Sequence, residues 1–224
     1  MSALATVGLV GCASNSTPLA DVLSAVVSER FGSGEESTLD IKPDSHYRYL
    51  KIEVDGRSPA LLVLGYIDAH PQGDIEVWYS AKREVIKTQN GRIVSTTGLE
   101  TDWRAVRFPS APPRWTEVLM QRGVYLRLRD EMPGHRFAIA DHLALESWHG
   151  VPPISLPTSI PDQQARAYGW FRETTLDSTA PFLPPAWYAW SVYRGQPTVV
   201  YSEQCLSATF CLKLQRWPVQ DSAS

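Results

Sequence analysis

Residues 84–97 read Glu84-Val85-Ile86-Lys87-Thr88-Gln89-Asn90-Gly91-Arg92-Ile93-Val94-Ser95-Thr96-Thr97. Two β-prone runs flank Asn90-Gly91, and both of these residues tolerate the positive φ angles that a type I′ turn requires. The stretch therefore predicts a β-hairpin with a two-residue loop. In that register Gln89 faces Arg92 and Ile86 faces Ser95.

Patterns typical of short β-strands extend from this hairpin in both directions. They cover Tyr47–Val54, Ala60–Ile67, Ile75–Ser80, Val124–Arg129, Arg136–Ala140, Ala165–Glu173, Trp187–Tyr193, Thr198–Ser202 and Thr209–Gln215. The proline-rich stretches 108–115 and 151–161 are expected to be loops. Many short strands separated by turns predict an all-β antiparallel fold, either a two-sheet sandwich or a partly open barrel.

One short amphipathic helix is expected near the N-terminus, over residues 18–31. The apolar residues that recur there at helical spacing are Leu19, Val22, Leu23, Val26 and Val27. Pro18 suits the first turn of a helix, and Gly32 suits its end.

Composition and charge exclude several classes of protein. The 224 residues are enough for one domain with a sizeable core, or at most two small ones. A formal net charge of −3 and a pI near 6.0 lack the basic character of a nucleic-acid-binding protein. Beyond the N-terminus, no run of about 18 apolar residues predicts a transmembrane helix.

The N-terminus has the pattern of a bacterial lipoprotein signal. Leu9-Val10-Gly11-Cys12 follows a short apolar run and precedes the small polar residues 13–17. Such a signal is cleaved before the cysteine, whose thiol takes a diacylglycerol and whose amine takes a third acyl chain; more than one chain makes anchoring stable. No Lys or Arg precedes the apolar run, so we expect Met1 to stand inside the apolar region of the signal. The alternative is an ordinary N-terminal strand with a buried cysteine.

This signal divides the chain into three parts. Residues 1–11 would be a signal peptide, 12–17 a lipidated tether, and 18–224 a single β-rich periplasmic domain. Ala13 follows the cysteine at the position where Asp would favour retention in the inner membrane. We therefore expect a periplasm-facing domain that is anchored in the outer membrane through Cys12.

Two cysteines remain once Cys12 is assigned to the lipid. Cys205 and Cys211 form an even pair in an oxidising compartment, which predicts a disulfide that closes a short hairpin or loop. Two buried free thiols are the alternative. A zinc site is less favoured because no His or Cys partner stands at ligand spacing.

Several of these segments together resemble the YjbF/GfcB lipoproteins, which are associated with group 4 capsule and exopolysaccharide export. The similar segments are Leu61–Gly65, Val77–Ser80, Asn90–Leu99, Asp102-Trp103, Val200–Cys205 with Cys211, and Gln215–Trp217. Residues 109–162 depart from the family pattern. The resemblance implies a mostly β outer-membrane lipoprotein encoded beside polysaccharide-export genes, and it brings no catalytic residues.

The sequence contains no recognisable catalytic or metal-binding constellation. His142, next to Asp141 and near Glu146, would form a metal or acid–base pair only on a helix. Asp130 and Glu131 are adjacent, whereas glycoside hydrolysis needs opposed carboxyl groups. A Gly-x-Ser-x-Gly motif and a glycine-rich phosphate loop are both absent. We therefore expect no enzymatic activity, no metal and no cofactor.

The chain contains eight tryptophans. In β-proteins such rings usually fill the core, but exposed ones can stack on the C–H faces of sugars. Trp187 and Tyr188 would point to opposite faces of a strand. Trp103 lies between Asp102 and Arg104, so we predict that its ring is partly exposed. Trp103 and Trp187 are the candidate contacts for a polysaccharide or a partner protein.

The function favoured by the sequence is a non-enzymatic lipoprotein that serves capsule or exopolysaccharide secretion by binding the polymer or the secretion machinery. Two alternatives stay open. A periplasmic lipid or lipoprotein carrier would need a continuous apolar cavity inside a half-open barrel, and a polysaccharide-modifying enzyme would need converging carboxylates or a histidine in a cleft. A filled core would favour the binding protein.

Overall fold

The computed structural model describes residue 44 and residues 46–217 of the chain. The lipoprotein motif with Cys12 and the helix expected over residues 18–31 lie outside the described residues. No helix in the described part of the chain is long and apolar enough to cross a membrane.

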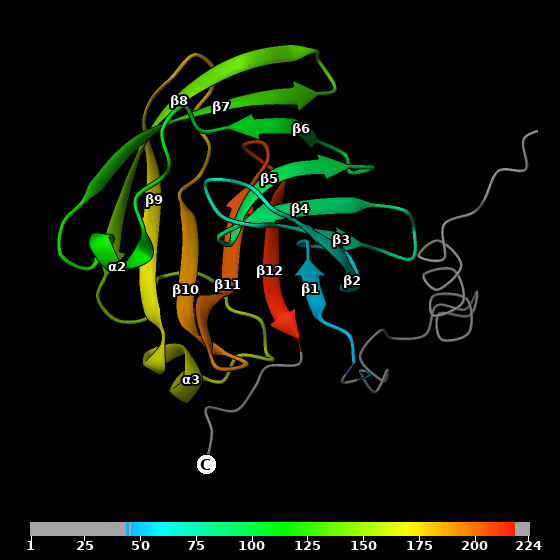
Figure 1. The fold of residues 1–224 in the computed structure, drawn as a ribbon, viewed down its shortest axis with the longest axis vertical. Coiled ribbons are helices and arrows are strands. Elements are labelled where there is room, and N and C mark those ends of the chain that lie inside the picture. The colour runs from blue at the N-terminus through cyan, green and yellow to red at the C-terminus, as the bar shows by residue number, and fades with distance from the viewer. Residues whose placement is uncertain (1–43, 45, 218–224) are drawn as a thin grey trace, which may run out of the picture. The chain divides into compact units, whose positions relative to one another are not determined.

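Twelve antiparallel strands form one continuous sheet in the described residues (Figure 1). They are β1 (Tyr49–Glu53), β2 (Ala60–Asp68), β3 (Ile75–Tyr79), β4 (Val85–Gln89), β5 (Arg92–Thr97), β6 (Asp102–Arg107), β7 (Gly123–Met132), β8 (Arg136–Trp148), β9 (Gly169–Ser178), β10 (Ala186–Tyr193), β11 (Gln196–Cys205) and β12 (Cys211–Trp217). Their order is β5-β4-β3-β2-β1-β12-β11-β10-β9-β8-β7-β6, and β5 and β6 come into contact. The sheet is therefore curled into a nearly closed barrel. The predicted all-β antiparallel fold is confirmed, as a barrel rather than two separate sheets.

Side chains, rather than a backbone ladder, join β5 to β6. The backbone N–H of Trp103 donates to Thr96 Oγ1 at 2.9 Å, and Ser95 Oγ donates to the backbone oxygen of Arg104 at 3.0 Å. Thr96 is buried. Hydroxyl groups of β5 thus satisfy backbone groups at the β6 edge of the sheet, where a ladder would otherwise do so.

The hairpin of β4 and β5 has the predicted turn. Asn90 and Gly91 have φ angles of 50° and 81°, and Gln89 pairs with Arg92. The predicted pairing of Ile86 with Ser95 is wrong, because the register shifts and Ile86 lies opposite Thr96. A β-bulge of this kind adds one residue to one strand and bends it.

The interior of the barrel is filled by two apolar clusters. One surrounds the fully buried Trp78 and includes Ile86 and Ile93, and the other surrounds Phe171 and Tyr188. The hairpin of β4 and β5 crosses β11 between them (Figure 1).

Gln204 of β11 holds this crossing together. Its side-chain oxygen accepts the backbone N–H of Ile93, and its side-chain nitrogen donates to the backbone oxygen of Gly91, both at 2.9 Å. Gly91 also packs so closely on Val199 that a Cβ atom there would lie 2.4 Å from Val199 Cβ.

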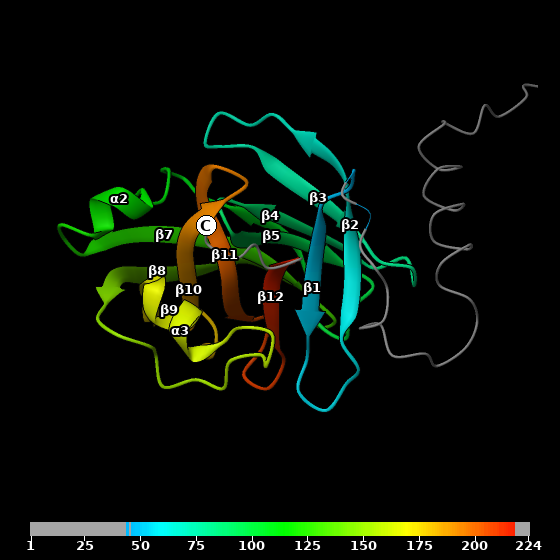
Figure 2. The same ribbon diagram turned by 90° about the horizontal axis from the view of Figure 1, so that it is seen from below.

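The described residues also contain two short helices that were not predicted, and Val118 of the first packs into the inner cluster around Phe171 and Tyr188. α2 (Trp115–Val118) follows the proline-rich stretch expected to be a loop, and α3 (Asp162–Ala167) occupies the start of the strand expected over Ala165–Glu173. α3 and the preceding loop cover the outer face of β9 to β11 with an apolar cluster around Trp170 and Tyr201 (Figure 2). Strand β6 was also not predicted, and β8 continues to Trp148, well beyond the expected end at Ala140.

Candidate functional site: a buried arginine–carboxylate cluster

Strand β7 directs a polar stripe into the barrel. Tyr125, Arg127, Arg129 and Glu131 alternate along it and are all buried. Successive side chains of a strand point to opposite faces, so these four share the inner face. Buried charges are costly unless they are paired, and the neighbouring strands supply the partners.

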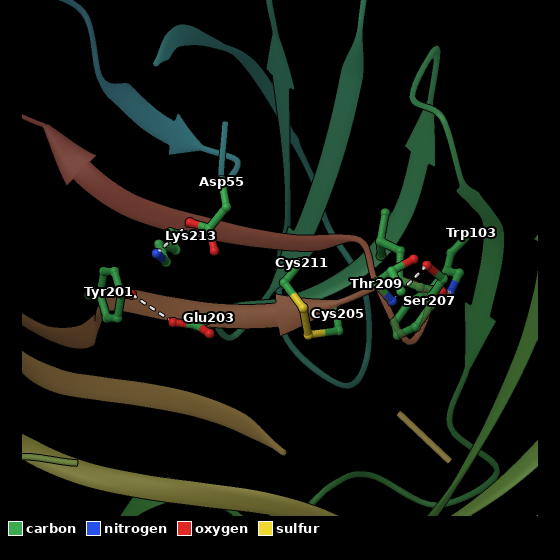
Figure 3. The surroundings of a disulfide bond; sticks show 10 residues. Asp55, Trp103, Tyr201, Glu203, Cys205, Ser207, Thr209, Cys211 and Lys213 are labelled. Carbon is green, nitrogen blue, oxygen red and sulfur yellow. Dashed lines mark hydrogen bonds and ion pairs between the residues drawn. A yellow bond between two sulfur atoms is a disulfide. The ribbon is translucent and has the colours of Figure 1, made fainter. Parts of the chain in front are cut away.

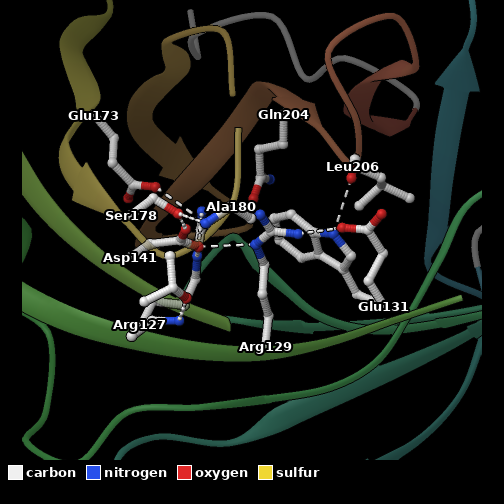
Figure 4. Close-up of polar contacts among 12 residues, drawn as sticks. Arg127, Arg129, Glu131, Asp141, Glu173, Ser178, Ala180, Gln204 and Leu206 are labelled. Carbon is white, nitrogen blue, oxygen red and sulfur yellow. Dashed lines mark hydrogen bonds and ion pairs between the residues drawn. The ribbon is translucent and has the colours of Figure 1, made fainter. Parts of the chain in front are cut away.

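Asp141 of β8 lies at the centre of this pairing (Figure 4). Its Oδ2 accepts hydrogen bonds from Arg127 Nη2 at 2.9 Å and Arg129 Nε at 2.8 Å, and its Oδ1 accepts one from Ser178 Oγ at 2.6 Å. Burial alone would raise the pKa of Asp141, but the charge of Arg127 and the hydrogen bonds from Ser178 and Arg129 lower it overall. Asp141 is therefore a carboxylate at neutral pH.

Two further carboxylates complete the cluster. Glu131 pairs with Arg129 and with the half-exposed Arg136. Glu173 of β9 lies with its Oε1 at 3.4 Å from Arg127 Nη1.

The third buried arginine of the cluster, Arg92 of β5, lies on the other side of Glu173. Its Nε donates to the Tyr125 hydroxyl at 3.2 Å and is 3.6 Å from Glu173 Oε2. Its guanidinium carbon is 4.1 Å from the centre of the Trp115 ring, and that ring packs on Tyr188 with 5.0 Å between ring centres. Arg92 is thus held between aromatic rings and one shared carboxylate.

A narrow pocket opens beside the cluster. Its lining includes Trp103, Arg127, Glu173, Tyr188 and Gln204, and its apolar side is formed by Leu143, Leu183, Pro184 and Ala186. The pocket has room for about one water molecule. It is too small for an acyl chain or a sugar ring as it stands.

The exposure predicted for Trp103 is wrong, because its side chain is only 1% exposed. Its indole N–H donates to the backbone oxygen of Leu206 at 3.0 Å, and the guanidinium carbons of Arg127 and Arg129 lie 4.7 and 5.3 Å from its ring centre. Charged neighbours on a strand point to the opposite face, so they say nothing about the burial of the residue between them.

Trp187 is also buried, with 6% of its surface exposed. Its ring packs edge-on against Trp148, with 5.0 Å between ring centres, while the adjacent Tyr188 belongs to the inner cluster. Neither Trp103 nor Trp187 therefore has a face free to stack on a sugar.

The predicted disulfide is confirmed. Cys205 and Cys211 are bonded and lie opposite each other at the end of the β11–β12 hairpin (Figure 3). The short connection between them contains Leu206, whose backbone oxygen accepts the hydrogen bond from Trp103. The disulfide therefore closes the loop that supports one side of the pocket.

The histidine and carboxylate pairs weighed in the sequence are separated by the strands. β8 is a strand, so Asp141 points into the barrel while the exposed His142 lies 3.9 Å from Asp177. On β7, Asp130 pairs outside with Arg107, whereas Glu131 points inward. Within the described residues, no three His, Cys, Asp or Glu side chains are placed to hold a metal ion.

Sequence reasoning missed the buried cluster. The alternation Tyr125-x-Arg127-x-Arg129-x-Glu131 was a usable signal, because it places four polar side chains on one face of a strand. The local sequence of this strand does not show that this face points into the barrel.

The fold and the cluster define a class of protein: an all-β, nearly closed barrel with a packed interior and a paired charge cluster at its centre. The crystal structure of the hypothetical lipoprotein YmcC from Escherichia coli K12 has the same fold, with a TM-score of 0.64 and 14% sequence identity over 95% of this chain and 100% of that one. No curated protein matches the sequence.

The sequence comparison identifies the family. A family model described as "Group 4 capsule polysaccharide lipoprotein gfcB, YjbF" matches residues 27–146. The chain belongs to this family of capsule-associated lipoproteins. The matched region contains β1 to β7 and most of β8, including Arg92, Arg127, Arg129, Glu131 and Asp141.

Proposed function

We propose that this chain is an outer-membrane lipoprotein with an accessory, non-catalytic role in capsule or exopolysaccharide secretion. Residues 1–11 would be removed as a signal peptide, Cys12 would carry the lipid, residues 12–17 would be the tether, and 18–224 would face the periplasm. The domain would bind the polymer or a protein of the export machinery. The family match over residues 27–146 is the observation that carries this proposal, and the Leu9–Cys12 motif supports the anchor.

The filled interior favours a binding protein over a lipid carrier. A carrier needs an apolar cavity that can hold an acyl chain, but here two apolar clusters and a charge cluster occupy the inside of the barrel. The pocket beside the cluster is partly lined by charged groups. Charged walls of this kind disfavour a hydrocarbon ligand.

The pairing of the carboxylates favours a binding role over glycoside hydrolysis. A general acid needs a pKa near the working pH, which a carboxyl group gains from an apolar or negatively charged environment. The pKa of Asp141 is instead lowered, and Glu131 and Glu173 each contact an arginine. Asp141 therefore lacks the raised pKa of a general acid.

The anchor is tested by intact mass and membrane fractionation of the native protein beside Cys12→Ser, with Ser14→Ala as the matched control. We expect a triacylated, membrane-bound wild type and control, and an unprocessed or soluble Cys12→Ser variant. A wild type that keeps residues 1–11 and stays soluble would contradict the anchor.

The role in secretion is tested by deleting the gene and complementing it with the wild type or with Cys12→Ser. Surface and periplasmic polysaccharide would be measured separately. We expect deletion to reduce surface polymer, and only the wild type to restore it. Unchanged surface polymer after deletion would overturn the proposed function.

A further inference from the structure

The positive charge of the cluster is least neutralised at Arg92. Four guanidinium groups, those of Arg92, Arg127, Arg129 and Arg136, meet the three carboxylates of Glu131, Asp141 and Glu173. Asp141 accepts hydrogen bonds from two of these arginines. Among the described residues, the only carboxylate near Arg92 is that of Glu173, which also pairs with Arg127. Arg92 Nε lies 3.6 Å from Glu173 Oε2 and makes no hydrogen bond to it.

Arg92 also has a donor without an acceptor. Among the buried side-chain nitrogen and oxygen atoms in the described part of the chain, only Arg92 Nη2 and Gln215 Nε2 have no hydrogen-bond partner. Arg92 is 5% exposed, so water cannot readily satisfy this nitrogen. A buried guanidinium that has an N–H group without an acceptor favours binding of an oxygen that carries negative charge.

The hydroxyl groups around Arg92 do not supply that negative charge. Burial raises the pKa of Tyr125 and of Tyr188 well above the usual value, so both remain neutral phenols at neutral pH. The Tyr125 hydroxyl accepts a hydrogen bond from Arg92 Nε and donates a hydrogen bond to Glu173.

The partly exposed residue over Arg92 is Trp115. It begins the four-residue helix α2, and on this helix only Val118 is buried. The Trp115 indole N–H donates to the backbone oxygen of Asn90 at 3.2 Å. The Trp115 ring also packs on Phe171 and Tyr188, with 5.0 Å between ring centres in each pair. Rotation of this side chain would break these contacts and expose the guanidinium, and an indole beside an arginine can stack on the C–H face of a sugar.

We propose that Arg92 and Trp115 form a binding site for an acidic sugar, in which the sugar carboxylate accepts hydrogen bonds from Arg92 and the sugar ring stacks on the indole. This inference rests on the proposed function, because it names the polymer class that the domain would contact. It extends that function to polymers that contain uronic acids or other carboxylated sugars.

The test is calorimetric titration of the full, lipidated chain in detergent with a short galacturonic acid oligosaccharide. The same oligosaccharide after carboxyl reduction is the matched ligand control, and inorganic phosphate tests for a free oxyanion. The variants are Arg92→Met and, as the control at an exposed arginine, Arg107→Met. Near-UV circular dichroism checks that each variant keeps its tertiary packing.

We expect the acidic oligosaccharide to bind and to change tryptophan fluorescence, and Arg92→Met to weaken this binding at least tenfold while Arg107→Met does not. Binding by the reduced oligosaccharide or by inorganic phosphate as tight as by the acidic one would overturn the inference. Unchanged binding in a folded Arg92→Met variant, or none in the wild type, would also overturn it.

The two proposals fail separately. If the acidic oligosaccharide does not bind but deletion of the gene still reduces surface polymer, only the acidic-sugar site is wrong. If the oligosaccharide binds through Arg92 but deletion leaves surface polymer unchanged, the role in secretion is wrong and the site stands.

Discussion

Removal of Arg127 would leave Asp141 and Glu173 buried with one guanidinium fewer between them. Breaking a buried ion pair by removing one partner costs about 3–5 kcal/mol, because an uncompensated charge stays in the interior. We expect Arg127→Met to lower the free energy of unfolding by about that amount. Denaturant unfolding monitored by tryptophan fluorescence measures it.

Arg107→Met is the control for this prediction. Arg107 pairs with Asp130 on the outside of the barrel, and its side chain is 50% exposed. Exposed ion pairs contribute about 0–1 kcal/mol. Equal losses of stability in the two variants would contradict the importance assigned to the buried cluster.

Asp141 makes stability depend on pH in the acid range. Its pKa is lowered on folding, so its contribution is fully present above the unfolded value of about 3.9 and is lost as the pH falls through the folded pKa. We expect the free energy of unfolding to decrease below about pH 4. The free-energy difference between wild type and Asp141→Asn should shrink over the same range. A constant difference at every pH would refute this assignment.

At the scale of single elements, the β4–β5 hairpin depends on Gly91 for two reasons. Its φ is positive, and an added Cβ would meet Val199. Gly195, in the turn between β10 and β11, has a similar φ of 76° but no atom within 4 Å of an added Cβ. A substitution at Gly195 therefore tests backbone strain alone, whereas a substitution at Gly91 tests backbone strain together with the close approach of the hairpin to β11.

We expect Gly195→Ala to cost about 1–2 kcal/mol, the strain of a left-handed residue with a Cβ. Gly91→Ala should cost about 1–3 kcal/mol more, the penalty of overpacking. Denaturant midpoints with unchanged m-values would measure both. If the two variants lost equal stability, the hairpin would not be packed on β11 as described.

At the scale of the whole molecule, closure of the barrel depends on Thr96. Its hydroxyl is the acceptor for the backbone N–H of Trp103. Thr96→Val keeps the shape of the side chain but leaves that buried N–H without a partner, which costs about 1–3 kcal/mol. We expect this loss together with faster amide hydrogen exchange at Trp103.

Thr97→Val is the matched control, because Thr97 is the exposed last residue of the same strand. It should change neither stability nor the exchange rate at Trp103 measurably. Slow exchange at Trp103 in Thr96→Val would show that other contacts close the barrel.

The sequence by itself determined the elements that depend on local chemistry. The Asn90-Gly91 turn follows from the positive φ angles that these residues tolerate, and the antiparallel all-β class follows from repeated short strands and turns. The disulfide follows from the even pair Cys205 and Cys211. The family was also recognisable from short motifs, because those motifs are contiguous in the chain.

Only the tertiary structure decided which face of each strand is the inside. Alternation along β7 separates the faces but does not say which one the curled sheet encloses, so the cluster of Arg127, Arg129 and Asp141 was not predicted. For the same reason Trp103 was placed outside, although the barrel buries it against two arginines. Arg92 meets Glu173 and Trp115 only because the hairpin crosses the barrel. Contacts between strands far apart in the chain depend on this closure, and a local pattern does not encode it.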